Sequence, residues 1–497
     1  MRIKRISLLA LCLLAVSMNA MAHDLVITNA NIINPDKKIV ARKGNIVIHN
    51  DRILKVDYSQ GEIPSNAVIF NAKGKYVIPG LIDSHNHVDT VLGLNEEQYY
   101  SHPDLVAEYR KQLPRSYLYF GYTTVIDLVS SDQNAIHSFT ASSVHPDLYT
   151  CGGGIMIANG YPMSEFPQPV RYAMFPNYVY EPSQTTSLPK DTDIKIHTPE
   201  AIIKRIVKSR AVCVKIFYEP GFGADKNLPL PALATVKKII QLAHQRHLPV
   251  LMHANSYQAQ EFALSSGADI FAHGLWNWGK FDKLSVLPLK IQHLLGDIVD
   301  QHLGYQPTMQ VVKGLSALID PQFLDNPELS HVVPRSLLSW YRTREGQWYE
   351  ELLFGKFPKS LIERRLKLKE SQLKLVVDYL RKSHANLLFG TDTPSGPTYG
   401  NPPGYNGYME MRDWYDANVP LSEILLAATM RNAKFFHLDK DYGSISPGKF
   451  ANLVILKKNP LHDINAYNSI ASVVIHGQIY KRSEFSANKV YSINAKT

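Results

Sequence analysis

The sequence predicts an α/β fold in which eight parallel β/α units close into a (β/α)8 TIM barrel, with a small β-sandwich domain formed from both ends of the mature chain. Three observations lead to this prediction. Strand-like apolar runs alternate with helical stretches in the middle of the chain, short strand-like runs gather at its two ends, and ligand-type side chains follow five of the central runs. Alternating strands and helices are typical of parallel sheets, and a TIM barrel carries its active site where the strands end.

Eight apolar runs are the candidate strands of the barrel. They lie near residues 77–83, 121–127, 147–156, 212–217, 249–253, 269–273, 303–308 and 386–392. Helical patterns occupy the intervals, for example at 198–209 and 232–246. Two intervals, 152–199 and 310–383, are longer than the fold requires. Long connections over a barrel mouth usually shape a substrate pocket, and surface decoration is the alternative.

The two ends of the chain share a pattern of short strands and turns. Strand-like runs lie at 25–27, 46–48 and 53–56, and again at 451–456 and 472–477. The turn-forming pair Asn50-Asp51 predicts a hairpin between two of them. We therefore expect β-sandwich parts at 23–75 and 438–497, with the barrel domain at 76–437 between them.

The first 22 residues predict a cleaved signal peptide. A basic start, with Arg2, Lys4 and Arg5, precedes an apolar segment and the small-residue site Ala20-Met21-Ala22. The expected localisation is periplasmic or secreted. An uncleaved anchor is the alternative, but the apolar run is short for a membrane span.

The mature chain contains two cysteines, Cys151 and Cys213. Two cysteines in a chain of this size do not indicate a disulfide framework. Cys213 lies two residues before Lys215 and would share its face on a regular strand, but we interpret it as a packing residue.

Composition excludes several classes of partner. The formal charge is +9, yet the basic residues are spread along the chain apart from an amphipathic stretch near 359–374. A nucleic-acid-binding protein would show a concentrated basic face, so we expect no nucleic-acid partner. After the leader no 20-residue apolar span occurs, so we expect no membrane domain. The expected partner is a small-molecule substrate, and the oligomeric state stays open, a homo-oligomer included.

His85 and His87 close the apolar run that starts at Val77. Side chains alternate along a strand, so residues two apart point to the same side. The two imidazoles can therefore face one point, as a shared metal ion requires. Because the chain has 19 His, such a pair also arises by chance.

Four later apolar runs decide between these interpretations, because each ends in a residue that can bind a metal. Those residues are Lys215, His253, His273 and Asp392. Core packing does not explain why five strand ends offer such side chains, and a barrel would bring all of them to one face. The pattern predicts a metal centre.

These segments resemble the amidohydrolase superfamily, in particular its imidazolonepropionase-like and prolidase-like branch. The resemblance covers nearly the whole mature chain. The matching segments are residues 79–87, 121–127, 214–216, 253–254, 272–274, 390–393, 427–429, 432–433, 443–449 and 459–461.

The resemblance implies two divalent metal ions, with zinc as the expected metal. The ligands it implies are His85, His87 and Asp392 for one ion, His253 and His273 for the other, and a carboxylated Lys215 as the bridge. Two cations held close together need an anionic bridge, and carboxylation turns a lysine amine into one. A buried lysine without such a role would be costly.

The resemblance also implies a mechanism in which a metal-activated water attacks a carbonyl. Asp392 would take the proton of that water and deliver it to the leaving nitrogen. Tyr218, three residues after Lys215, is the expected donor to the developing oxyanion. Arg171 and Tyr172, in the first long connection, are candidates for binding a substrate carboxylate.

The sequence departs from the family pattern after the last predicted strand. Relatives often carry a Leu-His-x-Glu-Leu stretch there, whereas this chain has Gly407-Tyr408-Met409-Glu410-Met411. The histidine position holds Tyr408, which affects the expected substrate more than the metal centre.

The predicted function is an exported metal-dependent hydrolase that cleaves an amide-type C–N bond, with a dipeptidase as the preferred activity. A cyclic amidase, or a lactonase or esterase, would use the same metal centre on a different carbonyl. A binding protein on an inactivated barrel would lack a ligand, and none of the six is missing.

Overall fold

The computed structural model describes residues 24–36, 38–59, 66–129, 132–183, 188–222 and 227–489. The predicted signal peptide lies outside the described residues. Within these ranges, the search for a helix with the length and apolarity of a membrane span finds none.

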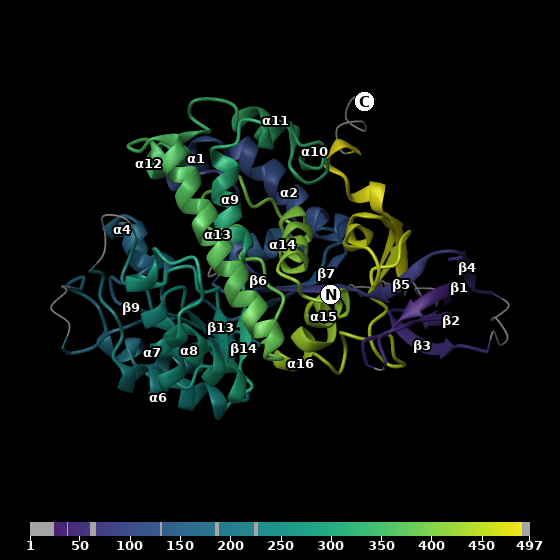
Figure 1. Cartoon of the computed structure of the whole chain (residues 1–497), viewed down its shortest axis with the longest axis horizontal. Coiled ribbons are helices and arrows are strands. Elements are labelled where there is room, and N and C mark those ends of the chain that lie inside the picture. The colour runs from purple at the N-terminus through teal and green to yellow at the C-terminus, as the bar shows by residue number, and fades with distance from the viewer. Residues whose placement is uncertain are drawn as a thin grey trace, which may run out of the picture.

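Strands from both ends of the chain form one sheet of eight strands, at the side of the molecule where purple and yellow segments meet (Figure 1). The strands are β1 (Asp24–Ile33), β2 (Ala41–His49), β3 (Arg52–Asp57), β4 (Val68–Asn71), β5 (Tyr76–Pro79), β16 (Leu453–Leu456), β17 (Ile470–Ile475) and β18 (Gln478–Lys481). Their order is β18-β17-β16-β5-β1-β2-β3, with β4 beside β1. The predicted hairpin at residues 50–51 joins β2 to β3, which pair antiparallel.

The strands of this end sheet follow one hydrogen-bonded path, and the path curls back on itself. Arg52 at the start of β3 pairs with Phe450 just before β16, and the Ala451 N–H donates to the Asp51 carbonyl. The curled sheet has its own apolar cluster, to which both ends of the chain contribute.

The apolar run at 77–83, predicted as one barrel strand, is divided at Gly80. β5 ends at Pro79 and pairs antiparallel with β16, whereas β6 (Leu81–Asn86) pairs parallel with β7 (Tyr122–Asp127). A Cβ at Gly80 would lie 1.9 Å from Thr123 Oγ1. The chain therefore passes from the end sheet to the central strands through a position that tolerates no side chain.

The central strands form two parallel sheets. One has the order β6-β7-β8, and the other has the order β11-β12-β13-β14-β15. The additional strands are β8 (Asp147–Thr150), β11 (Val214–Phe217), β12 (Val250–His253), β13 (Ile270–Ala272), β14 (Gly304–Gln306) and β15 (Asn386–Leu387). Each predicted strand region overlaps one of the strands in these two sheets, so the parallel β/α organisation is confirmed.

Backbone hydrogen bonds connect the two parallel sheets at both of their edges. On one side, the Ile155 N–H donates to the Lys215 carbonyl at 2.7 Å. On the other, the Asp392 N–H donates to the His85 carbonyl at 2.8 Å. Two of the predicted ligands, Lys215 and Asp392, thus lie at the places where the sheets meet.

Helices pack on the strands through apolar stripes. α5 and α6 lie where helices were predicted, and α6 buries Val236, Ile239, Ile240 and Ala243 at helical spacing. The helices outside the two long connections are α1 (Glu96–Ser101), α2 (Pro103–Tyr119), α3 (Gln133–Thr140), α5 (Pro199–Lys208), α6 (Leu233–His244), α7 (Tyr257–Ser266), α8 (Leu289–Asp300), α14 (Tyr405–Asp416), α15 (Leu421–Leu426) and α16 (Asn432–Phe435).

The two long connections contain structure of their own. The first holds β9 (Met156–Ile157), α4 (Gln168–Met174) and β10 (Tyr178–Val179). The second holds α9 (Gln310–Leu318), α10 (Leu329–Val332), α11 (Arg335–Trp340), α12 (Trp348–Phe354) and α13 (Lys359–Lys382). The amphipathic stretch near 359–374 is part of α13, the long green helix in Figure 1.

Cys151 and Cys213 form a disulfide, which corrects the interpretation of Cys213 as a packing residue. Both are fully buried; Cys151 follows β8 and Cys213 precedes β11. The bond therefore joins the two parallel sheets. Spacing gave no sign of it because the cysteines are 62 residues apart and meet only when the sheets come together.

We predict that replacing both cysteines (Cys151→Ala with Cys213→Ala) lowers the free energy of unfolding by about 2–5 kcal/mol, since a cross-link over such a loop restricts the unfolded chain. Chemical denaturation of wild type and variant, each without reductant, measures the difference. Equal stability, together with two titratable thiols in the denatured wild-type chain, would contradict the cross-link.

Candidate metal centre

The six predicted ligands lie on parallel strands or soon after the carboxyl ends of these strands. Five of them are buried and His87 is half-buried. His85 is on β6 and Lys215 on β11, His253 ends β12, and His87, His273 and Asp392 come soon after strands β6, β13 and β15. The parallel arrangement brings these separate strand ends to one edge, as the sequence pattern predicted.

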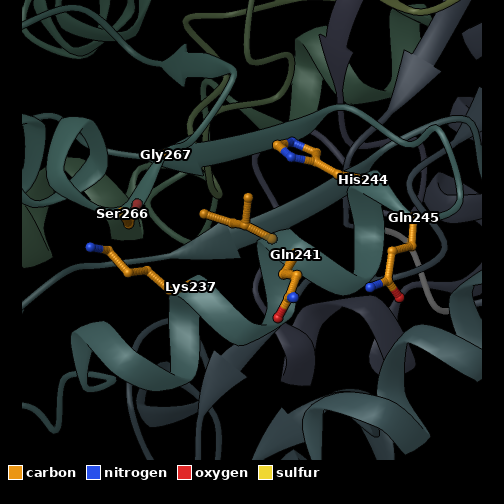
Figure 2. A pocket seen from close by; sticks show the side chains of 7 residues that line it. Lys237, Gln241, His244, Gln245, Ser266 and Gly267 are labelled. Atoms are coloured by element: carbon orange, nitrogen blue, oxygen red, sulfur yellow. The ribbon is translucent and has the colours of Figure 1, made fainter.

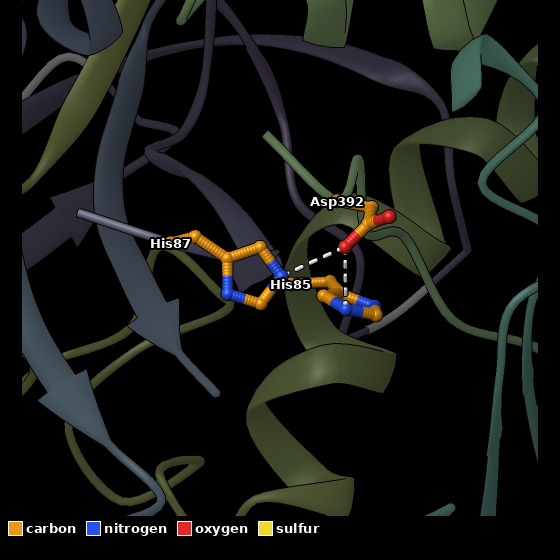
Figure 3. A group of neighbouring side chains, drawn as sticks. All are labelled: His85, His87 and Asp392. Atoms are coloured by element: carbon orange, nitrogen blue, oxygen red, sulfur yellow. Dashed lines mark hydrogen bonds and ion pairs between the residues drawn. The ribbon is translucent and has the colours of Figure 1, made fainter. Parts of the chain in front are cut away.

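Asp392 is the centre of the cluster (Figure 3). Its Oδ1 lies 2.8 Å from His87 Nε2 and 3.0 Å from His85 Nε2, and its Oδ2 lies 3.6 Å from His273 Nδ1. The ligand atoms of His85, His87 and Asp392 all lie within 4.8 Å of one another. Two imidazoles and a carboxylate at this separation can bind one metal ion.

Lys215 and His253 complete the group. Lys215 Nζ lies 3.4 Å from His85 Nε2, and the ring centroid of His253 lies 4.4 Å from that of His273. The structure thus brings all six predicted side chains into one connected cluster.

Burial sets the ionisation of the cluster. It lowers the pKa of the Lys215 amine to about 7 and of His85 to about 3, and it also lowers the pKa of His253. Burial opposes the charge of Asp392, but His273 and His85 hold the pKa of that carboxyl well below its usual value. Burial opposes the charge of His87, but its hydrogen bond to Asp392 raises the pKa of that imidazole. The neutral imidazoles of His85 and His253, the ionised carboxylate and the readily deprotonated amine are forms that metal binding requires.

The backbone is strained at two of the predicted ligands. His273 has φ 87° and Asp392 has φ 56°, both in the left-handed region. Non-glycine residues are uncommon there and concentrate at functional sites. At Asp392 the hydrogen bond from its N–H to the His85 carbonyl helps to hold this conformation.

Three polar residues that the sequence analysis missed orient the histidines. Gln306 Oε1 lies 3.0 Å from His85 Nδ1, Glu219 Oε2 lies 3.3 Å from His253 Nε2, and Thr308 Oγ1 lies 3.3 Å from His273 Nδ1. Such partners fix the ring and tautomer of a metal-binding histidine. Gln306 ends β14 and Glu219 follows β11, so the strand-end rule that found the ligands could have found them too.

Tyr218 does not point at the cluster. Its ring stacks on Phe262 of α7, with centroids 3.9 Å apart. Tyr218 is the first residue after β11 and lies three residues after Lys215, an odd separation that on an extended chain turns its side chain to the opposite side. The predicted catalytic role of Tyr218 overlooked this alternation.

Arg171 and Tyr172 hold their own loop. Tyr172 donates to Asn159 Oδ1 at 2.7 Å, and Arg171 Nη1 donates to the same oxygen at 3.4 Å and through Nε to the Phe166 carbonyl at 2.9 Å. These contacts shape the first long connection, and the substrate-carboxylate role of the pair stays a prediction.

A surface hollow lies at the opposite end of the strands (Figure 2). It has a volume of about 550 Å³ and is lined by Lys237, Ile240, Gln241, His244, Gln245, Ser266 and Gly267. His244 ends α6 and Gly267 follows α7, so both precede a strand. None of the six ligands lines this hollow, and the chemistry points to the strand-end cluster.

The amidohydrolase family model matches residues 76–275 and 356–480, which together hold all six predicted ligands. The chain belongs to the amidohydrolase family.

Solved structures share the fold of this amidohydrolase. A prolidase from Bifidobacterium longum is 20% identical, with 92% of this chain and 94% of that chain covered and a TM-score of 0.60. A prolidase complexed with N-methylphosphonate-L-proline is 16% identical, with 92% and 100% covered and a TM-score of 0.64. At such identities the similarity shows the fold alone.

A curated relative matches only a short segment of this amidohydrolase. An adenine deaminase from Clostridium botulinum (strain ATCC 19397 / Type A) is 34% identical over 67 residues. The match covers 14% of this chain and 11% of that protein.

The departure from the family pattern at residue 408 has a local explanation. Tyr408, on α14, donates its hydroxyl to Asn465 Oδ1 at 2.9 Å. Glu410 on the same helix is fully buried and accepts the backbone N–H groups of Met309 and Gln310. Tyr408 therefore contacts the C-terminal part of the chain, while Glu410 holds the loop after β14 that carries Thr308.

We predict that Glu219→Gln weakens metal binding about 10- to 100-fold, because it removes the carboxylate that accepts from His253. Metal retained after dialysis against graded chelator concentrations measures the effect. Glu261→Gln is the matched control, since Glu261 is exposed on α7 and bonds to Tyr257. Equal metal retention in both variants would show that Glu219 does not support His253.

Proposed function

We propose that this protein is an exported, metal-dependent hydrolase that cleaves an amide-type C–N bond. The observation that carries the proposal is the cluster in which Asp392 contacts His85, His87 and His273 beside the buried Lys215. Family membership supports the same reaction class. In the proposed fold, the hydrogen bonds at both edges of the parallel sheets close the eight strands into a TIM barrel.

The residues present fit two divalent metal ions. His85, His87 and Asp392 would hold one ion, and His253 and His273 the other. The mixture of imidazole and carboxylate ligands suits zinc. Such ions would supply a water of lowered pKa and would polarise the substrate carbonyl.

Lys215 fits the role of an anionic bridge after carboxylation. Its amine is buried, and burial lowers its pKa to about 7, so a neutral amine is accessible near neutral pH. The neutral nitrogen would attack the carbon of carbon dioxide, form an N–C bond and release one proton. The resulting carbamate is an anion, which replaces a costly buried ammonium.

Asp392 would act as the proton carrier of the reaction. Its carboxylate is ionised, because its pKa lies well below the usual value. It would accept a proton from the attacking water and deliver it to the leaving nitrogen as the C–N bond breaks. His85 and His87 hold the carboxylate in place for both transfers.

A dipeptide is the preferred substrate class. The support is the fold shared with two solved prolidases. A cyclic amide, or a lactone or other ester, is the second candidate, since its carbonyl would meet the same nucleophile.

Export is supported by two features. The first 22 residues have the composition of a signal peptide. The buried disulfide between Cys151 and Cys213 suits an oxidising compartment such as the periplasm.

We predict that Asp392→Asn lowers kcat about 10²- to 10⁴-fold, because an amide cannot accept and return the proton. Hydrolysis of alanyl-proline, dihydrouracil and γ-butyrolactone, followed by product release over time, tests the three substrate classes. Asp325→Asn is the control, because Asp325 is exposed and pairs with Arg342 outside the cluster.

Each outcome decides one point. Activity on one probe that disappears in Asp392→Asn supports the reaction and names the substrate class. Full activity in Asp392→Asn would remove the proton-carrier role. A metal-loaded wild-type protein that hydrolyses none of the three probes would overturn the proposed function.

A further inference from the structure

We propose that Tyr161 is the catalytic tyrosine, with its hydroxyl donating a hydrogen bond to the substrate carbonyl oxygen. This inference rests on the proposed function and adds a residue to it. Tyr161 belongs to the first long connection, and no strand-end pattern in the sequence points to it.

The ring of Tyr161 lies against the metal cluster. Its centroid is 5.2 Å from that of His253, and the phenol is half-buried. His253 and His273 are the two histidines that would hold the second ion. A tyrosine packed on one of them lies beside the substrate that this ion would polarise.

Two phenylalanines fix the direction of the ring. The ring centroid of Phe217, at the end of β11, lies 5.8 Å from that of Tyr161. The ring centroid of Phe222 lies 5.4 Å from that of Tyr161, and the planes of these two rings are nearly perpendicular. Phe217 points to the same side of β11 as Lys215, because it is two residues further on. Phe222 is 45% exposed. Tyr161 therefore stands between the buried cluster and the surface.

The hydroxyl of Tyr161 is available to a substrate. Among the residues that the structure describes, it has no hydrogen-bond partner, in contrast to Tyr172, which donates to Asn159. A phenol hydroxyl donates one hydrogen bond as well as accepting others, so this one can donate to a substrate oxygen. A preorganised donor at the developing oxyanion is among the largest contributions to catalysis.

The loop that carries Tyr161 is held firmly. Asn159, two residues earlier, has φ 59° and accepts from Arg171 and Tyr172. At Gly160 a Cβ would lie 2.5 Å from Ile157 Cγ2, so the loop packs too closely for a side chain. The contacts made by Arg171 and Tyr172 thus help to place Tyr161. The hydroxyl is then positioned before substrate binds, so the reaction does not have to supply the entropy cost of ordering it.

The proposed step conserves atoms and charge. The oxygen of the attacking water bonds to the carbonyl carbon as one O–H bond of that water breaks and its proton passes to Asp392. The C=O π electrons move to the carbonyl oxygen, and Tyr161 donates a hydrogen bond to that oxygen while keeping its proton. The C=O bond then reforms as the C–N bond breaks, and Asp392 protonates the leaving nitrogen.

We predict that Tyr161→Phe lowers kcat about 10²- to 10³-fold on the substrate class that wild type hydrolyses, since one oxyanion donor is lost. KM and metal content stay within about twofold, because the ring and all six ligands remain. Tyr218→Phe is the matched control, as it removes the hydroxyl of the tyrosine that packs on Phe262. Wild-type kcat in Tyr161→Phe, or an equal loss in Tyr218→Phe, would overturn the proposal.

A binding measurement keeps the test independent of turnover. Acetohydroxamate presents a carbonyl oxygen to a metal centre, and calorimetry on the zinc-loaded protein measures its affinity. We expect Tyr161→Phe to weaken binding at least 5-fold and Tyr218→Phe to leave it unchanged. Unchanged binding in Tyr161→Phe would overturn the role of Tyr161 even if wild type is an active hydrolase. Weakened binding in a protein that hydrolyses nothing would retain Tyr161 as a carbonyl-binding residue and reject the proposed reaction.

Discussion

The contacts of Asp392 with three histidines are the constraint on which the site depends. Its carboxylate contacts His85 and His87, at the end of β6, and His273, just after β13. Its backbone N–H meets the His85 carbonyl. One residue therefore joins the last strand region to the first and positions the imidazoles at the same time. Asp392 can keep its left-handed backbone conformation because its contacts with the surrounding strands hold it in place.

The buried polar groups give the site its character. Lys215, His253 and His273 are removed from water, and burial favours the uncharged form of each. An apolar core would tolerate such groups poorly without partners. Contacts from Thr308 to His273 and from Glu219 to His253 meet part of this need, and metal ions would meet the rest. The disulfide at Cys213 lies next to β11, which carries the buried Lys215. It therefore stabilises a strand that contributes a buried polar group to the core.

The sequence predicts the parallel strands and the proximity of the six ligands because strand ends and spacing are local signals. It does not reveal the curled end sheet or the disulfide, since both arise when distant segments meet. The division at Gly80 is hidden because apolar residues lie on both sides of it. Tyr218 was chosen by nearness in sequence, whereas strand alternation turns it toward Phe262. Tyr161 lies in a long connection, where periodicity gives no guide to position.

The most direct test of the metal centre is the metal content per chain of protein purified with zinc and bicarbonate, measured beside Lys215→Ala. We expect two equivalents in wild type and a clear loss in the variant, because the bridge between the ions is removed. A lysine-to-alanine change on the surface, Lys238→Ala, controls for the substitution itself. One equivalent in wild type, unchanged in Lys215→Ala, would contradict the bridged pair and require a mechanism built on a single ion.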